Sequence, residues 1–205
     1  MRFIIIIAAV SFISCGQSSS KTKEIAEKRD STKSSLVTVK TLSDAKDKPI
    51  TYTAPDEEHV NEILKAKYGT EWHVLNDKEA SWMKDAFDYF IIPKRKDNPN
   101  YPYITKGDYN GDGKADIAAV VTNDKKSTYQ IAIILGTDNI LFWKEDILED
   151  AAISTVTKSE IEGMEQEKTK KVKLKGDGIT IDYFERGSFV VYWDKTSFKR
   201  IQTGD

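Results

Sequence analysis

Residues 103–135 read YITKGDYNGDGKADIAAVVTNDKKSTYQIAIIL and contain a Gly- and Asp-rich segment followed by two apolar runs. From Tyr103 onward the sequence pattern changes to a period of two, which is typical of strands rather than helices. Ile117–Val121 and Tyr129–Leu135 are strand-like, and the polar residues 123–127 between them predict a hairpin loop. The stretch therefore predicts two antiparallel strands, and the first of them belongs to the core.

Further short strands are expected towards the C-terminus. Ile140–Trp143 and Ile153–Thr157 are apolar enough for strands, whereas Ser159–Lys170 is polar and is predicted to be a loop. Ile179–Tyr183 and Phe189–Trp193 alternate between apolar and polar residues. This succession of hairpins favours a mainly antiparallel sheet.

Two helices are expected before the strands. Pro55–Glu58 reads as a helix start, because proline suits the first turn and acidic residues complement the helix dipole. Apolar residues follow at helical spacing, and Gly69 is a plausible end. A second helix is predicted from Asn76 or Asp77 to Pro93. Helices followed by serial hairpins predict an α+β fold, with both helices packed on one face of the sheet.

The segment Asp108–Asp116, DYNGDGKAD, carries recognisable chemistry. Side chains that contain oxygen stand at loop positions 1, 3, 5 and 9, and Ca²⁺ prefers six to eight oxygen ligands. The predicted ligands are the side chains of Asp108, Asn110, Asp112 and Asp116, together with the backbone carbonyl of Lys114. Gly111 and Gly113 permit the backbone torsions that such a loop requires. The alternative is a turn rich in Gly, Asp and Asn that satisfies its own backbone amides.

The loop resembles the calcium loops of FG-GAP and VCBS repeats, in which Asp-x-Asn-Gly-Asp-Gly-x-x-Asp precedes an apolar strand. The resemblance covers about twenty residues and implies a Ca²⁺ cofactor. One loop is present instead of an array, so a propeller is not implied. Position 12 is Ala119, where an EF-hand has a bidentate glutamate, and a strand replaces the exit helix. The weak ligand set favours a structural ion, with a Kd of about 10⁻⁴–10⁻³ M.

The N-terminus reads as a secretory leader. Met1–Arg2 is followed by an apolar run of eleven residues with a single interruption, Ser11, which is too short to span a bilayer. The run ends at Phe12–Gly16, which resembles a bacterial lipoprotein lipobox with Cys15 as the diacylated residue. That resemblance implies a membrane anchor in the cell envelope, and Gly16 after the cysteine favours the outer membrane. The expected organisation is a signal peptide over 1–14, lipidated Cys15 with a flexible tether over 15–48, and one domain over 49–205.

Composition limits the classes of function. The formal net charge of −2 gives no basic field for nucleic acid, and one cysteine with two histidines leaves little for thiol or imidazole chemistry. We find no nucleophile elbow, phosphate loop or dinucleotide fingerprint. A calcium-stabilised, non-enzymatic binding domain is favoured, with protein, peptidoglycan or glycan as its ligand. The alternative is a periplasmic or surface hydrolase that uses scattered Asp and Glu residues for acid–base chemistry.

Overall fold

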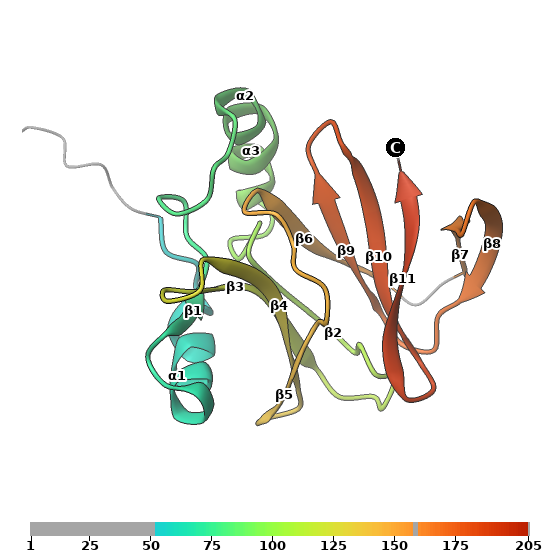
Figure 1. Ribbon diagram of the computed structural model, residues 1–205, viewed down its shortest axis with the longest axis horizontal. Coiled ribbons are helices and arrows are strands. Elements are labelled where there is room, and N and C mark those ends of the chain that lie inside the picture. Colours follow the sequence, from blue (N-terminus) through green and yellow to red (C-terminus); the bar gives the residue numbers. More distant parts are fainter. Residues whose placement is uncertain (1–51, 158–159, 205) are drawn as a thin grey trace, which may run out of the picture. The chain divides into compact units, whose positions relative to one another are not determined.

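The computed structural model describes residues 52–157 and 160–204, which belong to one compact unit. The described residues form two antiparallel sheets and a few short helices (Figure 1). The helices and the antiparallel pairing agree with the prediction, but the fold is mainly β and has two sheets instead of one. The strand β6 pairs with β9 and not with β5, so the chain starts a second sheet after residue 150.

The first sheet contains five strands in the described part of the chain. The central strand β3 pairs with β1 near its end, with β2 near its start and with β4 along its whole length. β5 then pairs with β4. The bounds are β1 Trp72–Val74, β2 Ile104–Gly107, β3 Asp116–Asn123, β4 Thr128–Leu135 and β5 Asn139–Phe142.

The second sheet contains six described strands in the order β6-β9-β10-β11-β7-β8. Consecutive hairpins build its middle, because β9, β10 and β11 pair in sequence. The bounds are β6 Ala151–Val156, β7 Glu160–Glu165, β8 Lys168–Lys173, β9 Gly178–Tyr183, β10 Gly187–Asp194 and β11 Ser197–Gly204.

A single main core joins the two sheets. Ile131 and Ile133 of β4 are fully buried in the same cluster as Ile153 of β6 and Ile179 of β9. Packing of two sheet faces against each other removes the apolar side chains of both from water. The sheets also meet at an edge, where the Ile153 amide donates to the carbonyl of Pro102 at 2.9 Å.

The helix α1, Glu57–Tyr68, packs against the first sheet, as the spacing of apolar residues predicts. Its residues Val60 and Leu64 are fully buried, and Gly69 follows its last turn with φ +86. In Figure 1, α1 lies on the side of the first sheet that faces away from the second. The apolar runs of β3 and β4 are therefore continuous because side chains on both faces are covered.

The second helical segment begins later than predicted and continues past Pro93. It consists of α2 (Lys84–Ala86), the π-helical η1 (Phe87–Ile91) and α3 (Ile92–Arg95). Asn76 caps only an isolated turn, in which the amide of Lys78 donates to its side chain at 3.0 Å. Proline lacks an amide hydrogen and crowds the carbonyl four residues earlier. The wider π turn before Pro93 accommodates it, so the proline does not end the helix.

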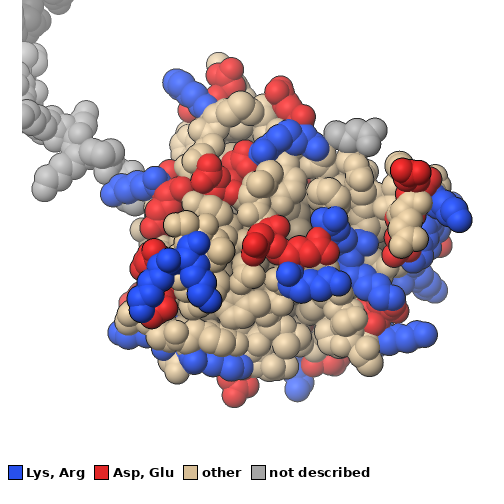
Figure 2. All heavy atoms as spheres, viewed as in Figure 1, with Lys and Arg blue, Asp and Glu red and all other residues tan. Residues whose placement is uncertain are grey.

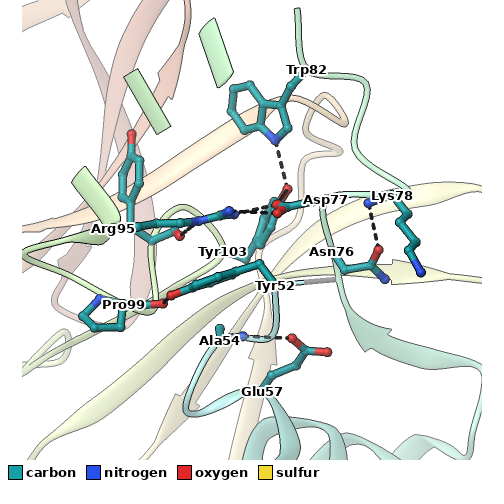
Figure 3. A network of polar contacts seen from close by, with 11 residues as sticks. Tyr52, Ala54, Glu57, Asn76, Asp77, Lys78, Trp82, Arg95, Pro99 and Tyr103 are labelled. Carbon is teal, nitrogen blue, oxygen red and sulfur yellow. Dashed lines mark hydrogen bonds and ion pairs between the residues drawn. The ribbon is translucent and has the colours of Figure 1, made fainter. Parts of the chain in front are cut away.

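A partly buried ion pair ties this helical segment to the rest of the unit (Figure 3). The guanidinium of Arg95 donates to both carboxylate oxygens of Asp77, at 2.8 and 2.5 Å. Tyr103 donates to the same carboxylate at 3.0 Å and accepts a hydrogen bond from the Trp82 indole at 2.9 Å. Because every polar group in this network has a partner, it fixes the position of α3.

The predicted loop at 159–170 was wrong, because β7 and β8 form a hairpin there. Gln166 and Glu167 both adopt positive φ, at 50 and 63, as a tight hairpin turn requires. The two strands are mostly exposed, so their sequences lack the apolar alternation of buried strands. Opposite charges face each other across the pair, as in Glu162 and Lys171, and Figure 2 shows basic side chains crowded over this part of the second sheet.

Candidate metal-binding loop between the two sheets

The candidate loop connects β2, which ends at Gly107, to Asp116, the first residue of β3. Gly111 and Gly113 have φ of +72 and +85, a region that side chains other than glycine rarely adopt. The predicted need for glycine at these two positions is thus confirmed. The short, tightly turned loop presents its polar side chains close to its own backbone.

The first two predicted ligands accept from one amide, and the third accepts from the amide of Lys114. The backbone N–H of Asp112 donates to Asp108 Oδ1 and to Asn110 Oδ1, both at 2.9 Å. The amide of Lys114 donates to Asp112 Oδ1 at 2.8 Å, and this bond lowers the pKa of the Asp112 carboxyl. The structure therefore brings Asp108, Asn110 and Asp112 together on the exposed part of the loop.

Asp116 lies behind the loop and is fully buried. Its Oδ2 accepts from the amide of Tyr109 and its Oδ1 from the amide of Gly136, both at 2.9 Å. Burial raises the pKa of this carboxyl, although the bonds from Gly136 and Tyr109 oppose the shift. Asp116 thereby joins the start of the loop to the turn between β4 and β5.

Sequence reasoning missed the partner of this loop on the second sheet. The amide of Asp108 donates to Asp177 Oδ2 at 2.9 Å, and the amide of Asp177 donates back to the carbonyl of Asp108 at 2.7 Å. A Cβ on Gly176 would overlap that same carbonyl oxygen. The residues Gly176–Gly178 read as an ordinary turn in the sequence, and only the paired fold shows that they hold the loop.

The donor set fits a cation in chemical type. Asp108, Asn110 and Asp112 carry side-chain oxygens of the type that Ca²⁺ prefers, and Lys114 would add its backbone carbonyl at loop position 7. The described ranges 52–157 and 160–204 contain no group of three or more His, Cys, Asp or Glu side chains placed to hold a metal. In this structure both carboxylate oxygens of Asp116 accept hydrogen bonds from backbone amides, so Asp116 supports the loop from its buried side.

The remaining predicted sites lie elsewhere. Cys15, the signal peptide over 1–14 and the tether over 15–48 are outside the described residues. Across the described part of the chain, no helix has the length and apolar character needed to cross a bilayer.

Several carboxyl groups have environments that alter their acidity. Burial raises the pKa of Glu57, Asp116 and Asp182, which stand on α1, β3 and β9 respectively. Their charged neighbours differ: Glu79 and Asp77 add to the raised pKa of Glu57 and Asp112 adds to that of Asp116, whereas Lys94 opposes the shift of Asp182.

Aromatic residues offer less exposed surface than the sequence suggests. Six aromatic residues between 101 and 193 could in principle line a surface for a sugar or peptide, but four of them are buried in the cores, and only Tyr183 and Trp193 of the six are partly exposed. The buried four are Tyr101, Tyr103, Trp143 and Tyr192. Packing, and not ligand recognition, therefore accounts for most of this group.

The chain was compared with protein-family models, curated proteins and solved structures, and none of them matches. The geometry of the chain itself consequently carries the functional argument.

Proposed function

We propose that this chain is a calcium-stabilised, non-enzymatic binding domain of a bacterial envelope lipoprotein. One observation carries the proposal: the loop 108–116 bonds to both sheets, through Asp116 to the first and through Asp108 to Asp177 on the second. An ion bound in this loop would stabilise the junction between the sheets, because a ligand that prefers the native state stabilises it.

The contacts described above suggest a separate role for each residue of the loop. Asp108, Asn110, Asp112 and the carbonyl of Lys114 hold Ca²⁺ on the open side of the loop. Ca²⁺ supplies positive charge that compensates the carboxylates gathered there. Asp116 keeps the loop in place through the amides of Tyr109 and Gly136 and contributes to the ion through water.

Anchoring is proposed from the leader alone. Diacylated Cys15 would hold the folded unit at the outer membrane, with residues 15–48 as a tether that gives it reach. Intact-mass measurement of the membrane-extracted protein tests this step. A mass that matches a chain starting at Cys15 plus acyl groups supports the anchor, and an unmodified chain after extraction contradicts it.

Calcium binding is tested by titration calorimetry. Ca²⁺ should bind the protein with a Kd of about 10⁻⁴–10⁻³ M. Asp112→Ala should abolish the signal, because Asp112 provides a ligand oxygen on the exposed side of the loop. Asp97→Ala is the matched control, since Asp97 is an exposed carboxylate beyond α3 and outside the loop. Equal heats from both variants would contradict the proposed site.

A further inference from the structure

A second feature of the fold is a cavity of about 380 Å³ between the helical segment 84–95 and the turn that joins β9 to β10. Figure 1 shows α2 and α3 beside this turn, and the rings of Phe90 and Phe184 meet there with centroids 5.9 Å apart. Asp182, Lys94 and Ser188 add polar groups to the lining. The volume lies within the range of sites for small molecules.

The carboxylate of Asp182 is unusual among the polar groups of the unit. It is partly buried on β9, and no hydrogen bond or ion pair joins it to another residue of the described chain. Burial raises the pKa of Asp182, while the charge of Lys94 lowers it in part. Its oxygens stay accessible to solvent, because no fully buried side-chain oxygen of the described residues lacks a hydrogen-bond partner. The cavity therefore offers a ligand a charged acceptor that no protein donor occupies.

Lys94 lines the same cavity, and its ammonium group has more N–H donors than protein acceptors. Its ammonium lies 3.6 Å from the centre of the Phe90 ring and 3.4 Å from the Tyr101 hydroxyl. Desolvation lowers the pKa of Lys94, and Asp182 opposes the shift. The two charged groups attract each other without forming an ion pair.

The signs of these charges restrict the ligand. Lys94 repels a cation, whereas Asp182 and the nearby Glu185 repel an anion. A neutral ligand that carries neighbouring donors and acceptors satisfies both groups at once. The aromatic faces of Phe90 and Phe184 favour apolar C–H surface beside those polar groups. A sugar ring combines these features, since it has hydroxyls around its rim and C–H groups on its faces.

We propose that this cavity binds a saccharide ring, with Asp182 accepting from one hydroxyl, Lys94 donating to another and the phenylalanine rings covering a C–H face. The inference rests on the proposed binding function and names its ligand class. The position of Lys94 is set by α3, which the partly buried Arg95–Asp77 pair holds in place.

Titration followed by nuclear magnetic resonance tests the proposal with glucose, galactose, mannose and N-acetylglucosamine as probes. At least one sugar should give saturable shifts at Lys94, Asp182 and Phe184 with a Kd of about 1 mM. Asp182→Ala should weaken binding about tenfold, which corresponds to the loss of one hydrogen bond to a charged group. Glu62→Gln, an exposed carboxylate on α1, should leave binding unchanged.

Several results would overturn the proposal. The first is no saturable shift at the cavity with any of the four sugars up to about 50 mM, far above a millimolar Kd. The second is sugar binding that Asp182→Ala leaves intact. The third is tighter binding of acetate or methylammonium, which would replace a neutral ligand by a charged one.

The same samples separate this inference from the broader function. If sugar binding persists in chelator and calorimetry detects no Ca²⁺ binding, only the calcium part of the proposed function is contradicted. Cleavage of an oligosaccharide during the titration contradicts the non-enzymatic function while keeping the saccharide site. Saturable sugar shifts that map away from Asp182 keep the binding function and reject this cavity.

Discussion

Asp116 shows how one residue supports two parts of the fold. It is fully buried, and each of its carboxylate oxygens accepts a hydrogen bond from a backbone amide, one from Tyr109 and one from Gly136. The sequence predicts Asp116 as a ligand equivalent to Asp108 and Asp112, but in the structure it supports the loop from its buried side. Its contribution to stability should therefore differ from that of an exposed loop carboxylate.

Asp116→Asn should lower the free energy of unfolding by about 1–3 kcal/mol, because an amide nitrogen would face a buried backbone donor. Urea denaturation measures this change, and Asp97→Asn serves as the exposed control. Equal free energies of unfolding for the two variants would show that the hydrogen bonds from Tyr109 and Gly136 do not contribute to stability.

Asp182→Asn should stabilise the protein at neutral pH. The pKa of Asp182 is raised in the folded state above its ordinary value of 3.8, so the folded chain favours the protonated form. The free-energy cost of ionising Asp182 in the folded protein is absent at pH values below its unfolded pKa and complete at pH values above its folded pKa. The variant should therefore exceed the wild type in stability at neutral pH and match it near pH 3. Urea denaturation at both pH values checks the sign, and a less stable variant at neutral pH would contradict it.

At the scale of elements, the loop 108–116 depends on the turn before β9. Gly176 sits so close to the loop that a Cβ would overlap the Asp108 carbonyl and approach the Gly111 amide to 2.7 Å. These neighbours are backbone atoms, so a side chain could enter only if the loop moved away from the second sheet.

Gly176→Ala should cost about 1–3 kcal/mol of stability through this overlap. It should also speed hydrogen exchange at the Asp177 amide, which now bonds to Asp108 at 2.7 Å. In Gly69→Ala, a Cβ meets nothing within 4 Å, and only the φ of +86 is strained. That control should leave Asp177 protected. Unchanged exchange in Gly176→Ala would mean that the turn does not hold the loop.

The elements differ in how far the sequence predicts them. The pattern around Val60 and Leu64 predicts α1 because burial on one face dictates it. β7 and β8 escape prediction because their residues are mostly exposed, and their pairing depends on the turn at Gln166 and Glu167. The role of Asp182 cannot be predicted for another reason. It occupies a polar position of β9, and the segment that covers it, residues 84–95, is far away in the sequence.

At the scale of the whole unit, the two sheets share one core, and the polar loop lies at their junction. The composition of the loop is readable from the sequence, because its proposed ligands are close together along the chain. Its attachment to Asp177 is not readable, because that contact joins residues 69 positions apart. Local chemistry is thus predictable here, and its connection to the fold is a property of the tertiary structure.

Thermal unfolding with Ca²⁺ and with chelator is the direct test of ion binding by the loop 108–116. For a Kd of about 1 mM, about 10 mM Ca²⁺ should add roughly 1.4 kcal/mol of stability. For a unit of this size, that gain raises the midpoint by about 3–6 °C. Asp112→Ala should lose the rise and Asp97→Ala should keep it. A midpoint independent of Ca²⁺ in the unmodified protein would contradict the claim and leave the loop as a turn that satisfies its own amides.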